Sequence, residues 1–279
     1  MVKILTDTTA GFSLTEAQEL GVHLVPQIVN FGEDSYRDDT ELDTANFLQR
    51  LRASNELPKT AAPPPALYDP FFAEAAQTGE TIICLHPSSK ISGTVRSATL
   101  AAQNHPDADV RIVDTQTIAG PLATLVLLAA QWARDGIPAD IILDGIEDTI
   151  VHQRIFVLVD TLEYLQKGGR ISGTRAGLGK VLNIKPILTM SDGQIEPFEQ
   201  ARTKKRAIAR LASLVQEQAE KEGDPRICVM HVDALEDAQT LIDMLQSSLG
   251  IRNIPLYELP PAIVVHAGPG ALAVGYLAQ

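Results

Sequence analysis

The sequence predicts an α/β fold of two α/β domains, with a ligand cleft between them. In the first half, short apolar runs rich in β-branched residues alternate with helical segments at the spacing of βαβ units, which is typical of a mostly parallel sheet with helices on both faces. In the second half the alternation gives way to a hairpin signal at 191–193, which implies a mixed α+β sheet. The length of 279 residues is enough for two cores. We therefore expect a Rossmann-like domain at residues 1–155 and a mixed domain at 156–279.

The expected elements of the first half follow from hydrophobic periodicity and capping residues. A capping box at 13–16 starts the first helix, and four prolines at 58–65 exclude a helix or a central strand there. Residues 32–39 form an expected charged loop. Strands are expected at 2–5, 22–31, 81–85 and 110–113, and helices at 14–20, 44–52, 67–78, 95–103 and 122–134.

The second half contains longer helices and less regular strands. A short helix at 161–167 ends at Gly168 and Gly169, and an apolar run at 262–266 is interpreted as a strand before a helix of small residues at 271–277. Further strands are expected at 155–159, 183–190, 194–199, 226–231 and 254–258, and further helices at 138–152, 203–222 and 235–249.

Composition excludes several classes of partner. The net charge of -12 argues against nucleic acid and anionic membrane surfaces. No apolar stretch approaches the length of about 18 residues that a membrane span needs, so we expect no stable membrane insertion. The chain enters a strand at once, without the pattern of a signal peptide. Cys84 and Cys228 lie in apolar runs typical of buried thiols, so we expect a cytoplasmic protein.

A serine-rich turn between the strand at 81–85 and the helix at 95–103 is the first candidate site. Ser92 is expected at the helix cap, and Gly93 allows the backbone to approach a ligand closely. The unpaired N–H groups and the dipole of a helix N-terminus favour an anion. An ordinary Ser/Thr cap without any ligand is the alternative.

Other polar residues fall where parallel strands end, the place at which ligands collect in such sheets. Asp7 and Thr8 follow the first strand, and Asp114 follows the fourth. The proline-rich segment could hold Thr60 at a fixed point, and His266 precedes an Ala-Gly-Pro-Gly run in an arrangement like that of Ser92. The turns at 6–11, 88–94 and 114–115 all fall at such strand ends.

Five segments in this order resemble the DegV family of bacterial fatty-acid-binding proteins. They are Thr-Asp-Thr-Thr at 6–9, Ser-Ser-Lys-Ile-Ser-Gly-Thr at 88–94, Tyr-Leu-Gln-Lys-Gly-Gly-Arg-Ile-Ser at 164–172, Leu-Asn-Ile-Lys-Pro-Ile-Leu at 182–188 with Asp192-Gly193 and Arg202, and His-Ala-Gly-Pro-Gly at 266–270. The resemblance implies one fatty acid, such as palmitate, stearate or oleate, buried between two α/β domains and no cofactor. By motif position its carboxylate would be held by Thr60, Ser92 and His266.

The resemblance also implies supporting residues and a partner. The partner would be a separate fatty acid kinase of the dihydroxyacetone-kinase-like type, which converts the presented acyl group to an acyl phosphate. Departures from the family pattern fall at Ala61, Ala62 and Ala267. The residues expected near the site are Asp7, Thr8, Gly93, Thr94, Ala267, Gly268, Arg170 and Arg202.

Basic residues gather in two neighbouring segments of this acidic chain, where they form either a docking surface or a solvated face that balances acidic helices. They are Lys167, Arg170, Arg175, Lys180 and Lys185, then Arg202, Lys204, Lys205, Arg206 and Arg210. The resemblance favours docking of the kinase.

Two enzyme hypotheses stay open beside the carrier. Ser92 and His266 with Asp7 or Asp114 could form a serine hydrolase, and the anion-binding turns could serve a phosphate-ligand-binding enzyme. However, the chain lacks both G-x-S-x-G and the Walker motif GxxxxGK[ST]. We therefore expect a binding protein without catalytic residues or metal ligands.

Overall fold

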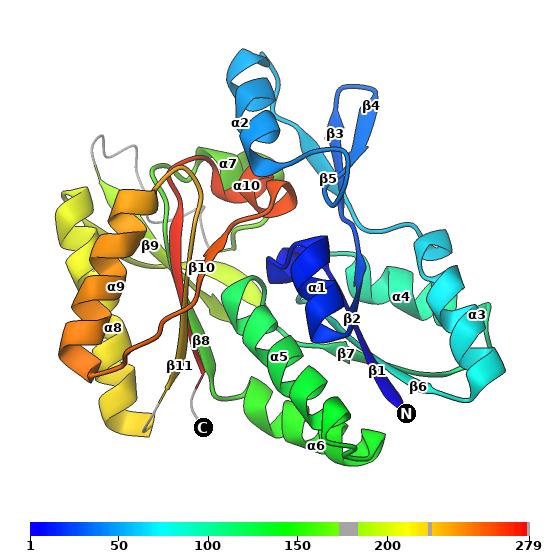
Figure 1. The fold of residues 1–279 in the computed structure, drawn as a ribbon. Helices are drawn as coiled ribbons and strands as arrows, with labels where there is room; N and C mark the ends of the chain where they lie inside the picture. The colour runs from blue at the N-terminus through cyan, green and yellow to red at the C-terminus, as the bar shows by residue number, and fades with distance from the viewer. Residues whose placement is uncertain (173–183, 223–224, 278–279) are drawn as a thin grey trace.

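The computed structural model describes residues 1–172, 184–222 and 225–277, whose strands form three sheets (Figure 1). The first is parallel, with the order β2-β1-β6-β7. Its strands are β1 (Val2–Asp7), β2 (Val22–Val25), β6 (Thr81–His86) and β7 (Asp109–Asp114).

Helices cover both faces of this sheet, as predicted. Alternate residues of a strand point to opposite faces, so Ile4 and Ile83 pack into one cluster and Leu5 and Ile82 into another. The first cluster contains residues of α1 (Leu14–Leu20), α5 (Gly120–Arg134) and α6 (Ala139–Ile150), and the second contains residues of α3 (Asp69–Thr78) and α4 (Thr94–Gln103).

The second sheet is mixed, which confirms the change in architecture expected after residue 150. Its order is β10-β9-β8-β13-β11-β12, and β11 and β12 are its parallel pair. The strands are β8 (Gln153–Leu158), β9 (Lys185–Ser191), β10 (Gln194–Ala201), β11 (Arg226–His231), β12 (Leu256–Glu258) and β13 (Leu272–Leu277). The division into domains at residue 155 falls within β8 and remains a prediction.

One face of the mixed sheet is covered by α8 (Lys204–Glu222) and α9 (Leu235–Leu249). The opposite face packs against α7 (Glu163–Gly168) and α10 (Pro261–Ala267), and α5 contacts strands of both sheets. The candidate cavity described below lies on this side of the mixed sheet. Among the described residues no helix is long and apolar enough to cross a bilayer.

A three-stranded antiparallel sheet extends from the parallel one and was not predicted. Residues 22–31 are two strands in different sheets, because Pro26 lacks the N–H that a continuing ladder would need. The predicted charged loop at 32–39 is mostly a hairpin. This sheet has the order β4-β3-β5, with β3 (Ile28–Phe31), β4 (Asp34–Arg37) and β5 (Lys59–Ala61), and α2 (Thr44–Ala53) packs beside it; short 3₁₀ turns lie at η1 (Thr8–Ala10) and η2 (Pro65–Leu67).

The order of the last two elements is the reverse of the prediction. Residues 262–266 lie in α10, which starts with Pro261 at its first position, where a missing N–H costs nothing. Residues 272–277 form the buried strand β13. Small residues occur there because α5 approaches closely: a Cβ on Gly275 would collide with Pro121 and Cys228.

Asp38 joins the extension to the end of β1. Its Oδ1 accepts the hydroxyl of Thr8 at 2.7 Å and the backbone N–H of Gln27 at 2.8 Å, while its Oδ2 is buried without a hydrogen-bond partner among the described residues. Burial raises the pKa of Asp38 from 3.8 to about 7, and the charge of Asp7 adds to this effect.

We predict that Asp38 makes stability depend on pH. Because its folded pKa is raised, its contribution is complete below about pH 4 and is lost as the pH rises through 7. Between pH 5 and 8 the free energy of unfolding of the wild type should fall by about 2–3 kcal/mol relative to that of Asp38→Asn. Urea titrations at several pH values across this range measure the free energy of unfolding, and Asp34→Asn, at an exposed position, is the control. Parallel curves for the wild type and Asp38→Asn would contradict the assignment.

Candidate anion and acyl-chain site

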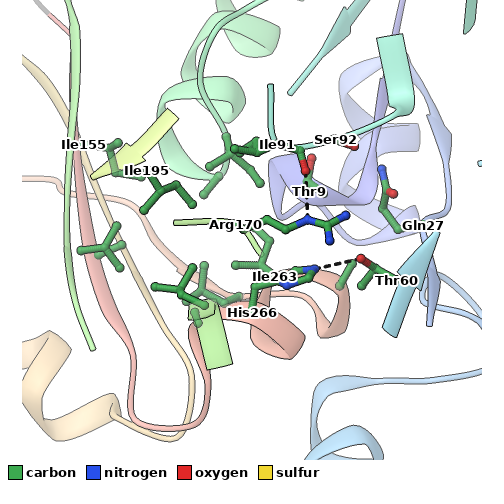
Figure 2. Close-up of a pocket in the computed structure, with 18 of the residues that line it drawn as sticks. Thr9, Gln27, Thr60, Ile91, Ser92, Ile155, Arg170, Ile195, Ile263 and His266 are labelled. Carbon is green, nitrogen blue, oxygen red and sulfur yellow. Dashed lines mark hydrogen bonds between the residues drawn. The ribbon is translucent and has the colours of Figure 1, made fainter. Parts of the chain in front are cut away.

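An apolar cavity lies between the parallel sheet and the inner face of the mixed sheet. With its open mouth it encloses about 900 Å³ of empty space. Figure 2 shows the polar residues gathered toward one end, with Ile155 and Ile195 toward the other. The apolar lining includes Ile118, Ile155, Val157, Val159, Leu165, Leu188, Ile195, Leu259, Ile263 and Ala273; the polar lining is Thr9, Gln27, Thr60, Ser92, Arg170 and His266.

Thr60 and His266 meet at the polar end although 206 positions separate them in the sequence. Thr60 lies on β5, the edge strand of the extension, and its Oγ1 is 2.9 Å from Nε2 of His266 on α10 (Figure 2). Gly168 at the end of α7 packs against the imidazole so closely that a Cβ there would collide with it. The glycine and the threonine therefore fix the ring from two sides.

His266 is a neutral imidazole at neutral pH. Burial, together with the smaller effect of the nearby positive charge of Arg170, lowers its pKa to about 4. Its Nδ1 is buried and has no hydrogen-bond partner among the described residues. A neutral ring can donate one hydrogen bond, but it supplies no formal charge to an anion.

Arg170 is the cation of the cavity. It follows Gly169, whose left-handed conformation ends α7 and turns the chain toward the cavity. The guanidinium donates from Nη1 to the carbonyl of Gly168 at 2.7 Å and from Nε to that of Ile91 at 3.3 Å. Within the described residues no carboxylate forms an ion pair with it. A cation beside an apolar cavity can bind an anionic ligand group.

The serine turn places Ser92 at the same end, although not at the helix cap as predicted. The cap is Gly93, because helix α4 begins at Thr94. Ser92 Oγ lies 2.7 Å from Thr94 Oγ1 and accepts the Thr94 backbone N–H at 3.3 Å. The hydroxyl is thereby fixed at the rim of the cavity rather than at the first turn of the helix.

The other predicted residues are divided between the lining and its support. Gly93 and Ala267 line the cavity, while Thr94, Asp7 and Thr8 are buried behind it. Gly268 packs against the ring of Tyr164. Of the unusual alanines, Ala62 and Ala267 line the cavity and Ala61 does not. Arg202 is exposed and outside the lining, and Arg175 and Lys180 lie outside the described residues.

The sequence did not predict Gln27 and Thr9 as lining residues. Gln27 Nε2 donates to Asp7 Oδ1 and to Thr94 Oγ1, each at 2.9 Å. Asp7 Oδ2 is also hydrogen-bonded to His86 Nδ1 at 2.8 Å, and both side chains are fully buried. The Pro26-Gln27 break in an apolar run was the available signal, and it was interpreted as part of one strand.

The residues present favour an anion with an apolar tail rather than a metal. No cluster of three His, Cys, Asp or Glu side chains that could hold an ion occurs in the described ranges. The polar end offers hydroxyls, an imidazole and a guanidinium, and the remainder of the lining is apolar.

Comparisons with known proteins agree with this geometry. A sequence model of the DegV family, described as uncharacterised proteins of that family, matches residues 1–279. A DegV domain-containing protein of Halalkalibacterium halodurans is 33% identical over 276 residues, which are 99% of this chain and 98% of that protein. The structure is similar to a DegV family protein from Thermus thermophilus, described as binding fatty acid, with a TM-score of 0.92, 31% identity and coverage of 100% and 99%. It is also similar to DegV of Bacillus subtilis, described as a fatty acid binding protein, with a TM-score of 0.88, 30% identity and coverage of 100% and 99%.

We predict that the imidazole of His266 in the ligand-free protein titrates near pH 4 in NMR spectra. Arg170→Gln should raise this pKa because it removes the positive charge that adds to the effect of burial. Lys167→Gln is the control, since Lys167 is exposed and bonded to Glu163 at 2.5 Å. An ordinary pKa near 6.5 would contradict the burial of the ring.

Proposed function

Because the chain belongs to the DegV family, we propose that it binds one long-chain fatty acid and presents the carboxylate to a separate fatty acid kinase. The observation that carries the proposal is one cavity with an apolar body and a polar end that contains Thr60, Ser92, His266 and Arg170. The fatty-acid binding described for the Thermus thermophilus and Bacillus subtilis proteins supports it.

The two parts of the cavity match the two parts of a fatty acid. Burial of an alkyl chain contributes about 0.8 kcal/mol per methylene, so that a sixteen-carbon tail gains on the order of 12 kcal/mol before the costs of binding. A carboxylate removed from water needs hydrogen-bond donors and a balancing charge. Ser92 and Thr60 supply hydroxyls, and Arg170 supplies the charge.

A serine hydrolase is less well supported by the same geometry. His266 bonds to Thr60 rather than to Ser92, and Ser92 bonds to Thr94. The two candidate acids are engaged elsewhere: Asp7 pairs with His86, and Asp114 accepts the hydroxyl of Ser89 at 2.5 Å. A catalytic triad requires hydrogen bonds from the nucleophile to the base and from the base to the orienting acid. These candidate groups are not linked in that way.

The carboxylate end adjoins a second opening, through which a kinase could reach the ligand. Thr60, Arg170 and His266 line both the cavity and this opening. Lys59 and Lys167 lie at the opening as well, although Glu56 also lines it. Exposed basic side chains beside the carboxylate are suited to a partner that carries phosphate groups.

Binding predicts that protein purified from a bacterial host carries about one fatty acid per chain. Ser92→Ala should weaken rebinding of palmitate by about 1–3 kcal/mol, because it removes a donor to the carboxylate. Ser89→Ala is the matched control: Ser89 lies in the same turn but bonds to Asp114 and does not line the cavity. Mass spectrometry of denatured extracts and calorimetry measure the two effects.

If no fatty acid is extracted and added palmitate and oleate do not bind, the carrier function is wrong. If binding occurs but Ser92→Ala and Ser89→Ala have the same affinity for palmitate, the carboxylate lies elsewhere in the cavity.

Presentation to a kinase predicts that Arg170→Ala and Arg202→Ala lower acyl-phosphate formation about tenfold or more, a loss equivalent to roughly 1.4 kcal/mol. The effect of Arg202→Ala should exceed any effect on fatty-acid affinity, because Arg202 is exposed and outside the cavity lining. The exposed Arg252→Ala is the control. Labelled ATP is supplied to the protein alone, the kinase alone and the mixture. Product from the protein alone would overturn the non-enzymatic assignment, and a mixture insensitive to both arginines would exclude their role in docking.

A further inference from the structure

We propose that the buried chain Asp7–Gln27–Thr94–Ser92 acts as a hydrogen-bond relay that fixes the Ser92 hydroxyl as a donor into the cavity, so that the site selects an ionised carboxylate over neutral lipids of equal chain length. The inference rests on the proposed function and adds positioning residues and a chemical criterion for the ligand. It depends on counting protons and lone pairs along the chain.

The relay begins at Asp7, which sets the orientation of the Gln27 amide. Asp7 Oδ1 already accepts the backbone N–H of Thr9 at 3.0 Å, so the amide atom 2.9 Å away must be the NH₂ group. The same nitrogen lies 2.9 Å from Thr94 Oγ1. Its two protons are therefore donated to Asp7 and to Thr94.

The Thr94 hydroxyl is the third member of the relay, between Gln27 and Ser92. Its hydroxyl accepts from Gln27, and the side chain is fully buried, so its own proton needs a partner in the protein. In the described part of the chain the acceptor within reach is Ser92 Oγ at 2.7 Å. Thr94 is consequently the donor of that hydrogen bond and Ser92 the acceptor.

Ser92 then has no free lone pair. Its Oγ accepts the hydroxyl of Thr94 and also the Thr94 backbone N–H at 3.3 Å. A hydroxyl oxygen has two lone pairs, so the remaining capacity of Ser92 is its own proton, which is available to the cavity that it lines. A ligand atom at this position must be an acceptor.

Because the relay is buried, its groups cannot exchange donor and acceptor roles by hydrogen bonding to water. Asp7 and Thr94 are fully buried, and Gln27 is only 3% exposed. The backbone N–H of Gln27 is held as well, by Asp38 Oδ1 at 2.8 Å, so the residue is fixed through both its main chain and its side chain. Reorienting one group would leave a buried donor unsatisfied, which is costly.

The chemical consequence concerns the head group of the ligand. Both oxygens of a carboxylate are acceptors and fit a fixed donor. The hydroxyl of a fatty alcohol also has a proton to donate, for which Ser92 offers no acceptor. Arg170 favours the anion too, but its effect does not depend on Thr94.

The test compares palmitic acid with 1-hexadecanol as competing ligands for the delipidated full chain. Thr94→Val removes the donor to Ser92 and frees a lone pair for the alcohol, while Thr94→Ser keeps the hydroxyl and is the matched rescue. We expect the ratio of the two dissociation constants to change about tenfold toward the alcohol in Thr94→Val and to stay at the wild-type value in Thr94→Ser. If Thr94 had only a structural role, Thr94→Val would weaken the binding of both ligands equally and leave the ratio of the dissociation constants unchanged.

Gln27→Met is the second variant, in case Thr94→Val does not fold, because it also removes the donor that orders the Thr94 hydroxyl. Thermal melting of each variant checks the fold. An unchanged ratio in a folded variant of either kind overturns the relay and leaves fatty-acid binding intact. A wild type that binds neither ligand instead overturns the proposed function itself.

Discussion

The constraint on which the site depends is the satisfaction of buried polar groups at the carboxyl end of β1. Asp7 lies there with no solvent access, and it accepts hydrogen bonds from Thr9 and Gln27 and is hydrogen-bonded to His86. Thr9 lies in η1, Gln27 between β2 and β3, and His86 at the end of β6, so one carboxyl group holds three segments in place. Removal of any donor would leave a buried acceptor or charge unpaired, which costs more than the bond contributes.

Close packing between the two larger sheets explains where the cavity lies. At α5 the approach is so tight that Gly120 and Gly275 leave no room for a Cβ, because Cys228 and Pro121 occupy that space. Ile118, Ile155 and Leu188, which belong to one apolar cluster, line the cavity. The apolar part of the cavity and its polar cluster are thus built from residues of both halves of the chain.

Sequence reasoning predicted the layers of the fold well, because periodicity and capping residues act locally; the box at Ser13 and Glu16 is formed as expected. It failed where tertiary packing decides. The apolar run at 262–266 has no period that separates a helix from a strand, and Pro261 and the contacts of Gly275 determine the outcome. Strand-end turns located Ser92 and Asp7, but the meeting of Thr60 and His266 depends on an extension that no local pattern indicated.

The distribution of the polar cluster along the chain has a thermodynamic consequence. Thr60 is on the small sheet and Ser92 follows the parallel one, whereas Arg170 and His266 come from the half that builds the mixed sheet. A molecule held by all four side chains would link these parts of the protein, as the hydrogen bond between Thr60 and His266 already does. Occupancy and the cohesion of these parts are then linked, because a ligand that binds only the folded protein increases its stability by RT ln(1 + [L]/Kd).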